Sequence, residues 1–372
     1  MKSLIFQCYA LAFCLSHAVA AISINITHRQ EMFKSRDAGY HIVKYRTPIL
    51  VKVPNGDLLA FSAPRKYTGA DASPKYIAQR RSTDGGLHWN LTEFIEDDHH
   101  VKDGLSLGLV IIDSDTNTTF ILFGYCLHTV GNCTSPYRPK GVYYKKSTDW
   151  GYTWSAPINV GNTNPALMGL AWAPGPGFGI QKKYAPNKGR LIGCGHMSLA
   201  MKCLYSDDHG KTWHLNNPLY VIPYKQSRTA GDFKPDETQI IELNNGNIFA
   251  TIRNQERFHC HCRLQGLSVD GGITFPIQNV TAEGSLLDPS VFASLALVND
   301  TLFLSHPYNS EKRVDMTLQW SLDYGKTWPH RYQVFNGSSE YSSLTQIDEN
   351  NLGLLFERSD YEYIEFYKIR LN

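Results

Sequence analysis

Histidine and cysteine, side chains that readily bind metal ions, alternate in one short segment of the sequence. Residues 258–262 read Phe-His-Cys-His-Cys, with His259, Cys260, His261 and Cys262 as possible ligands. Four such ligands could suit a tetrahedral zinc ion. On a strand, however, successive side chains point to opposite faces, so the two histidines would face one side and the two cysteines the other. The segment therefore predicts no metal site.

Aspartates that could act as acids or bases recur in a second pattern, Ser-x-Asp-x-Gly-x-(Thr/His)-(Trp/Phe). Five segments carry it, beginning at Ser82, Ser147, Ser206, Ser268 and Ser321. Their near-regular spacing indicates repeated supersecondary units. A short Asp can bond backbone N–H groups of its own turn, Gly supplies a positive φ, and the aromatic residue packs beside the turn. These aspartates are therefore predicted to close hairpins and not to catalyse a reaction.

The segments between these repeats have the pattern of short β-strands separated by Gly, Asn and Pro turns. Strands are expected at residues 57–61, 76–80, 119–123, 141–145, 190–194, 239–243, 248–252, 302–305, 352–356 and 364–369. A mature chain of about 350 residues and a repeat of about 58 residues give about six units. The sequence therefore predicts an all-β fold, a six-bladed β-propeller of four-stranded antiparallel sheets. No linker divides it, so residues 21–372 are expected to form one propeller domain.

The composition is that of a globular protein, with 42% hydrophobic and 19% charged residues. Because 36 Lys and Arg nearly balance 34 Asp and Glu, no basic surface for nucleic acid is expected.

Residues 1–20 are typical of a secretory signal peptide, since Lys2 precedes an apolar run and Ala18-Val19-Ala20 resembles a cleavage site. A retained anchor is the alternative, and no other transmembrane segment is expected.

Two further features fit the secretory pathway. Six cysteines remain after the leader, and Cys126–Cys133 and Cys194–Cys203 are expected to form disulfide bonds. Seven Asn-x-Ser/Thr triplets would carry glycans on surface loops. The triplets begin at Asn25, Asn90, Asn117, Asn132, Asn279, Asn299 and Asn336.

The repeated segments resemble the Asp-boxes of sialidases, and the likeness runs from about residue 40 to the end of the chain. Tyr45-Arg46-Thr47-Pro48 is similar to the Tyr/Phe-Arg-Ile-Pro signature of that family. Longer motifs make the sequence most similar to the lysosomal sialidase of animals. They occupy residues 102–108, 173–182, 189–196, 233–239, 253–255 and 259–263. The resemblance implies that the protein needs no metal or other cofactor.

The resemblance also implies a site for sialic acid, which carries a carboxylate on its anomeric carbon. Arg46, Arg253 and Arg313 match the family's three-arginine clamp, and Arg binds a carboxylate in bidentate fashion. Arginines about 6 Å apart would repel by roughly 3 kcal/mol per pair at an effective dielectric of about 20, so the cluster favours an anion among them. Glu357 resembles the carboxylate that braces the first arginine, and Arg65 resembles the arginine that faces C4 of the sugar.

Three residues resemble the family's catalytic groups. Tyr341, in Tyr-Ser-Ser-Leu, matches the nucleophile. A neutral phenol avoids the repulsion that a carboxylate would meet at a carbon that itself bears a carboxylate. Glu237 matches the base that activates the phenol, and Asp71 matches the acid/base that protonates the leaving oxygen and later activates water.

Two positions depart from the family pattern. Ala63 stands where the family often has Glu, so a carboxylate near Arg65 is missing and the preference for the C4 and C5 substituents is open. His306 stands where the family has Asn, and it is either a packed residue or a contact at the rim of the site. Asp103 is a further candidate for contact with the substrate.

The resemblance implies a retaining exo-α-sialidase with an acidic optimum, acting on glycoproteins, oligosaccharides and glycolipids such as gangliosides through a covalent sialosyl-tyrosine. The alternatives are a trans-sialidase and a non-catalytic Asp-box propeller that binds glycans or proteins. The family further implies the lumen of the lysosome, with secretion as the alternative. It also implies a lumenal carboxypeptidase as a protective partner.

Overall fold

A computed structural model describes residues 22–127, 133, 138–222, 233–257 and 260–372. The predicted signal peptide over residues 1–20 and the glycosylation triplet at Asn132 lie outside the described residues. The regular structure of the described chain is almost entirely β-strand, and its helices are 3-10 segments of three residues each. These are Ala38–Tyr40, Val160–Asn162, Pro165–Leu167 and Ile277–Asn279. No helix in the described part is long and apolar enough to span a membrane.

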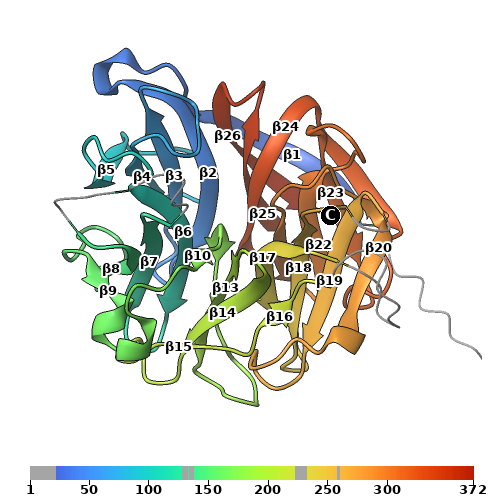
Figure 1. The fold of residues 1–372 in the computed structure, drawn as a ribbon. Coiled ribbons are helices and arrows are strands. Elements are labelled where there is room, and N and C mark those ends of the chain that lie inside the picture. Colours follow the sequence, from blue (N-terminus) through green and yellow to red (C-terminus); the bar gives the residue numbers. More distant parts are fainter. Residues whose placement is uncertain (1–21, 128–132, 134–137, 223–232, 258–259) are drawn as a thin grey trace, which may run out of the picture.

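The strands form sheets that are arranged around a central axis, which is the architecture of a β-propeller (Figure 1). Two of the sheets have four antiparallel strands each. The first contains β2 (Ile42–Lys52), β3 (Leu58–Lys66), β4 (Tyr76–Ser82) and β5 (Glu93–Asp97). The second contains β17 (Pro235–Glu242), β18 (Ile248–Asn254), β19 (Cys262–Ser268) and β20 (Val280–Leu287).

Two other sheets contain short additional strands. The five-stranded sheet contains β6 (Leu105–Asp113), β7 (Thr118–Tyr125), β8 (Gly141–Ser147), β9 (Ile158–Asn159) and β11 (Gly177–Phe178). In it, β11 runs parallel to β6. The six-stranded sheet contains β10 (Ala173–Pro174), β12 (Ile180–Gln181), β13 (Leu191–Met197), β14 (Ala200–Ser206), β15 (His214–Leu215) and β16 (Leu219–Tyr220).

The last sheet has seven strands, and its long strand β24 belongs to two ladders. Its strands are β1 (Ile24–Lys34), β21 (Ser294–Val298), β22 (Thr301–Pro307), β23 (Val314–Ser321), β24 (His330–Asp348), β25 (Asn351–Arg358) and β26 (Tyr363–Leu371). The first half of β24 pairs with β23 and the second half with β25. The predicted all-β propeller is confirmed, but the prediction of six separate four-stranded sheets is wrong. The described residues form five sheets, because β24 fuses two ladders and short strands widen two other sheets.

All ten expected strands overlap observed strands, and the Asp-boxes lie in turns that follow a strand, as predicted. In the box at Ser321, the serine hydroxyl donates to Asp323 at 2.7 Å and accepts the Gly325 N–H at 2.8 Å. The Asp323 carboxylate accepts the N–H and the hydroxyl of Thr327 at 2.8 and 2.7 Å. The Trp328 indole of the same box donates to Gln265 in the next sheet at 3.0 Å. Each box therefore closes a turn, and this box also ties two sheets together.

Strand register separates the first box from the predicted site. Ser82, which begins the box, pairs with Leu58 at the start of β3, whereas Arg65 lies near the end of that strand. Arg46 pairs with Ala63, close to Arg65. The box aspartate and the arginines therefore occupy opposite ends of this sheet.

The predicted disulfide bonds Cys126–Cys133 and Cys194–Cys203 are both present. The cysteines of the His-Cys segment form a third, Cys260–Cys262. Because β19 begins only at Cys262, the alternation of a strand does not hold across this pair. These thiols are consumed by a covalent bond and offer no thiolate to a metal ion.

Candidate active site

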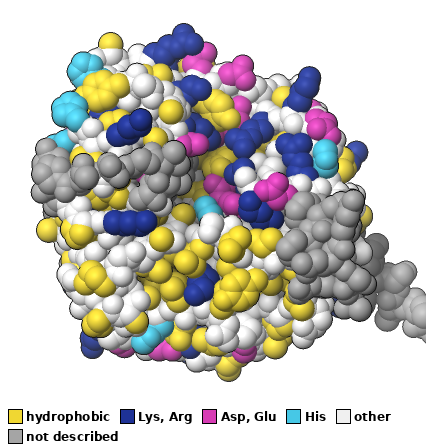
Figure 2. Space-filling model, in the orientation of Figure 1, with side chains coloured by type: hydrophobic (Ala, Val, Ile, Leu, Met, Phe, Trp, Pro, Cys, Tyr) yellow, Lys and Arg dark blue, Asp and Glu magenta, His cyan; other side chains and the backbone are white. Residues whose placement is uncertain are grey.

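A cavity of about 540 Å³ opens on one face of the propeller. Lys and Arg side chains gather around a hollow near the middle of the face in Figure 2. The three predicted clamp arginines and the three predicted catalytic residues all line this cavity, and so does Arg65. They are Arg46, Arg65, Asp71, Glu237, Arg253, Arg313 and Tyr341. Segments nearly 300 residues apart in the sequence therefore meet at one site, because the strands that carry them end beside the same axis.

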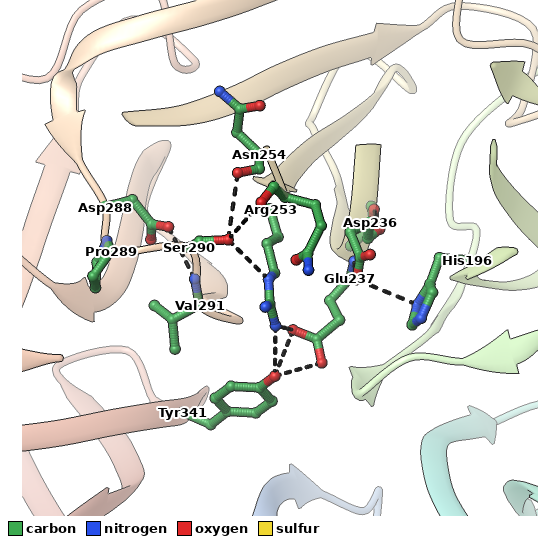
Figure 3. Close-up of polar contacts among 12 residues, drawn as sticks. His196, Asp236, Glu237, Arg253, Asn254, Asp288, Pro289, Ser290, Val291 and Tyr341 are labelled. Atoms are coloured by element: carbon green, nitrogen blue, oxygen red, sulfur yellow. Dashed lines mark hydrogen bonds and ion pairs between the residues drawn. The ribbon is translucent and has the colours of Figure 1, made fainter. Parts of the chain in front are cut away.

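Tyr341, in β24, contacts Arg253 and Glu237 through its hydroxyl (Figure 3). Its hydroxyl donates toward the carboxylate of Glu237, whose two oxygens lie 2.6 and 2.8 Å away. Arg253 Nη1 donates both to the Tyr341 hydroxyl and to Glu237, each at 2.8 Å. The phenol therefore has a carboxylate that can accept its proton and a cation beside the oxygen.

The environment separates the proton affinities of Tyr341 and Glu237. Burial, followed by the charge of Glu237, raises the pKa of Tyr341 well above its usual range. Burial also acts to raise the pKa of Glu237, but the positive charge of Arg253 and the hydrogen bond from Tyr341 outweigh it and lower that pKa. The resting pair is therefore a neutral phenol beside an ionised carboxylate, which is the arrangement that a general base and its nucleophile require.

Glu357, at the end of β25, braces the first arginine as predicted, although it does not itself line the cavity. Its Oε1 accepts from Arg46 Nε and from the Thr47 N–H, both at 2.7 Å. Its Oε2 accepts the backbone N–H of Tyr341 at 3.1 Å. One buried carboxylate therefore fixes both an arginine of the clamp and the strand that carries the phenol.

The other arginines surround the Tyr341 ring. The guanidinium carbons of Arg46 and Arg313 lie 5.4 and 5.6 Å from the ring centroid. Arg46 also lies 4.1 Å from the ring centroid of Tyr361, and Arg313 Nη1 donates to the Tyr361 hydroxyl at 3.2 Å. Three guanidinium groups around one phenol form a strongly positive site, which favours binding of an anion.

Asp71 lies on the loop after β3 and is 83% exposed, unlike the other predicted catalytic residues. Its carboxylate pairs with Arg65, whose Nη1 also donates to the Gly69 carbonyl at 2.7 Å. Partial desolvation by the surrounding protein acts to raise the pKa of Asp71, but the charges of Arg65 and then Arg46 outweigh it and lower that pKa. The carboxylate is therefore held ionised at the mouth of the cavity.

Two candidates from the sequence lie elsewhere. Asp103 is not among the residues that line the cavity. It is mostly buried, and its backbone N–H donates to the Ala72 carbonyl at 2.8 Å, behind the loop that carries Asp71. Asp103 therefore lies outside the cavity lining, and its contact with the substrate stays a prediction. His306 is fully buried in β22 and bonds Gln319 at 3.2 Å, so it is the packed residue and not a rim contact.

Four titratable residues of the cavity lining were not predicted: Lys75, His196, Asp236 and Tyr361. His196 Nδ1 lies 3.7 Å from Asp236, and both belong to motifs that the sequence had singled out. Burial, followed by the charge of Arg65, lowers the pKa of Lys75 to about 8. Tyr361 gave no sequence signal, because nothing in its neighbourhood distinguishes it among 21 tyrosines.

Outside the cavity, ligand atoms of Asp113, Asp115 and His209 lie within 4.8 Å of one another. The buried Asp113 already accepts hydrogen bonds from Thr116 and Gln181, at 2.7 Å each, and contacts His209 at 2.9 Å. These contacts account for the cluster as an internal hydrogen-bond network.

The fold and the site together define a propeller with Asp-box turns and a cationic axial cavity that holds a tyrosine. A family model described as a BNR repeat-like domain matches residues 56–354. A sialidase from Micromonospora viridifaciens is 31% identical over 339 residues, which cover 84% of this chain and 50% of that protein. The chain therefore belongs to the family of BNR repeat-like domains, and it spans half the length of this curated relative.

Solved structures agree with the fold. The structure of a Hadza microbial sialidase is 26% identical, with a TM-score of 0.68 over 88% of this chain and 66% of that one. An intramolecular trans-sialidase from Ruminococcus gnavus is 18% identical, with a TM-score of 0.70 over 91% of this chain and 96% of that one. The second likeness concerns the fold alone.

Proposed function

We propose that the protein is a retaining exo-α-sialidase that hydrolyses terminal sialic acids of glycoproteins, oligosaccharides and glycolipids through a covalent sialosyl-tyrosine. One observation carries this proposal: the Tyr341 hydroxyl lies between Glu237 and Arg253 in a cavity lined by three further arginines. A binding module would need the cations for an anionic sugar. It would have no need of a buried phenol paired with an ionised carboxylate.

In the first step, the Tyr341 oxygen attacks the anomeric carbon and its proton passes to Glu237, while the bond to the leaving oxygen breaks. Asp71 donates the proton that the leaving oxygen takes up. In the second step, Asp71 accepts a proton from water as the water oxygen attacks the anomeric carbon. The Tyr341 oxygen leaves and recovers its proton from Glu237. Two displacements at one carbon give net retention.

The sugar carboxylate is proposed to bind among Arg46, Arg253 and Arg313. Glu237 and Glu357 already compensate two of these charges, at 2.8 and 2.7 Å. A bound carboxylate would offset the remaining repulsion and place the anomeric carbon over the phenol.

Asp71 must be protonated to act as the acid, although its pKa is lowered in the free protein. A bound substrate would shield Asp71 from water and place a negative charge near Arg46, and both changes raise the pKa of a carboxyl group. The proposed optimum is therefore acidic, because protonation of Asp71 becomes rarer as the pH rises.

Release of a fluorogenic aglycone from an aryl α-sialoside at about pH 5 tests the proposal. We expect Tyr341→Phe to lower kcat/KM by more than about 100-fold, since the nucleophile is lost, and Asp71→Ala to lower it as well. Tyr332→Phe is the matched control, because Tyr332 is an exposed tyrosine of the same strand. Equal rates for the wild type, Tyr341→Phe and Asp71→Ala would contradict the proposal.

Transfer is the second candidate, because the fold is shared with an intramolecular trans-sialidase. Analysis of the product separates the two, since hydrolysis gives free sialic acid and intramolecular transfer gives an anhydro sugar.

The three disulfide bonds support a compartment of the secretory pathway, and we propose the lysosomal lumen from the acidic optimum.

A further inference from the structure

Two arginines of the clamp contact the same short segment, residues 288–292 between β20 and β21. The Ser290 hydroxyl accepts from Arg253 Nε at 3.2 Å, and the Ser290 carbonyl accepts from Arg313 Nη2 at 3.1 Å (Figure 3 shows the first contact). Arg253 comes from β18, whereas Arg313 directly precedes β23. A single residue therefore links two cations that approach from different ladders of the propeller.

The hydroxyl of Ser290 is held in one orientation. It lies 3.4 Å from the carbonyl oxygens of both Asn254 and Gln255, so its proton points to the end of β18. A lone pair of the hydroxyl oxygen is then directed to Arg253, so the hydroxyl serves both as a donor and as an acceptor. The residue has a φ of 62°, which orients its side chain and its carbonyl toward the two arginines.

The segment itself is anchored by a buried ion pair. Arg263 Nη1 donates to Asp288 and to the Val291 carbonyl, both at 2.7 Å, and Asp288 accepts the Val291 N–H at 3.0 Å. The side chains of Arg263 and Asp288 are 0% and 1% exposed. A buried pair of this kind costs desolvation energy, so its value lies more in fixing one geometry than in stabilising the fold.

The same segment also contacts the phenol. Val291 and Phe292 form an apolar cluster with Tyr341, and the rings of Phe292 and Tyr341 are 5.9 Å apart. Residues 288–292 therefore contact two arginines and the ring that those arginines surround. Ser290 is not among the residues that line the cavity, so it acts through its partners.

We propose that Ser290 is a positioning residue that sets the relative orientation of Arg253 and Arg313 for the carboxylate of the substrate. This inference rests on the proposed function, because it concerns the same anion. Loss of the hydroxyl would free Arg253 to rotate about its Nε, while Nη1 stays bound to Glu237. The affinity for the carboxylate would fall, and the chemistry at Tyr341 would change little.

The test uses Ser290→Gly, because glycine adopts a φ of 62° without strain and removes only the side chain. Two probes are titrated calorimetrically: the 2,3-unsaturated analogue of sialic acid, which is planar like the transition state, and its carboxamide. The wild type is expected to prefer the acid. In Ser290→Gly this preference falls by about tenfold, the scale of one hydrogen bond to a charged group. KM rises by about the same factor, and kcat changes by less than about threefold.

Two further variants complete the test. Ser285→Ala removes an exposed hydroxyl from the neighbouring strand β20 and is expected to behave as the wild type. Ser290→Asn keeps a side-chain acceptor on a residue that tolerates the left-handed region, and it is expected to recover part of the preference for the acid.

An unchanged preference in Ser290→Gly would overturn the inference, and so would an equal loss of affinity for the acid and the carboxamide. The proposed function fails separately. A wild type that prefers the acid but releases no sialic acid would refute the sialidase, while a lowered preference in Ser290→Gly would still support the role of Ser290. A wild type with no preference for the acid would overturn both.

Discussion

Among individual side chains, Tyr341 depends on its neighbours for its reactivity. A phenol with a raised pKa is a poor nucleophile by itself, and its reactivity requires that Glu237 take the proton as the new bond forms. Glu237 can do so because Arg253 keeps it ionised despite its burial. The same arginine contacts the phenol oxygen, so proton transfer leaves the emerging phenolate beside a cation.

Asp71→Ala should discriminate between leaving groups. A phenolic aglycone leaves readily without a proton, whereas a sugar alkoxide does not. We therefore expect kcat/KM to fall by more than about 100-fold on a sialylated oligosaccharide but by only about tenfold on an aryl sialoside. Parallel assays of both substrates check this. Equal losses on the two substrates would show that Asp71 does not protonate the leaving oxygen.

Glu340, next to the phenol, predicts a pH dependence of stability. It is 2% exposed, and burial, followed by the charge of Glu357, raises its pKa to about 7. The folded protein therefore binds this proton more tightly than the unfolded chain does. The resulting stabilisation is complete below about pH 4.5 and is lost as the pH rises through about 7, a difference of about 3 kcal/mol.

The variant Glu340→Gln removes this titration. We expect its unfolding midpoint to exceed that of the wild type by a few degrees at about pH 8 and to equal it at about pH 4.5. Thermal unfolding measured across this range checks the prediction. Glu349→Gln, at an exposed position, serves as the control. The prediction would be refuted if the unfolding midpoint of the wild type falls no more steeply with pH than that of Glu340→Gln.

Strand ends provide the geometry of the site. Arg253 and Glu357 lie at the ends of β18 and β25, and Glu237 lies near the start of β17.

The sequence predicted ten strands and the Asp-box turns, because local alternation and turn residues determine them. It did not predict that β24 carries two ladders, since no local signal marks where a continuous strand changes partner. Ser290 was missed for a similar reason, because its contacts come from residues 23 and 37 positions away.

The Asp-box turns should affect stability and leave activity unchanged. Asp323→Ala leaves the Thr327 N–H and two hydroxyls without their acceptor, which should lower the free energy of unfolding by about 1–3 kcal/mol. We expect kcat/KM to stay within about twofold of the wild type, because Asp323 is not among the residues that line the cavity. Chemical unfolding and the aryl-sialoside assay check both parts. Lys326→Ala, in the same turn, is the control, and loss of activity without loss of stability would contradict the structural role.

In the whole molecule, the two ends of the described chain meet in one sheet. β1 pairs antiparallel with β26, from Ile24 opposite Leu371 to Lys34 opposite Tyr363. The Arg46–Glu357 pair likewise joins residues 311 positions apart. The sequence indicated a closed propeller from the repeat. The meeting of the arginines followed only from the family resemblance, because no spacing along the chain specifies contacts of this range.

Removal of β1 tests this closure. A chain that begins at residue 35 exposes the edge of β26 and the apolar groups that β1 covers, so we expect its unfolding midpoint to fall by more than about 10 °C or the protein to aggregate. A chain that begins at residue 22 is the control. Scanning calorimetry and light scattering measure the two outcomes, and equal midpoints would show that β1 is dispensable.

Covalent trapping tests the central claim most directly. A sialic acid with fluorine at C2 and C3 should accumulate as an adduct, because fluoride leaves readily from C2 while the C3 fluorine slows hydrolysis of the intermediate. Peptide mapping by mass spectrometry should place this adduct on Tyr341 and find none in Tyr341→Phe. An active wild type that carries the adduct on another residue, or an equal adduct in Tyr341→Phe, would contradict the account.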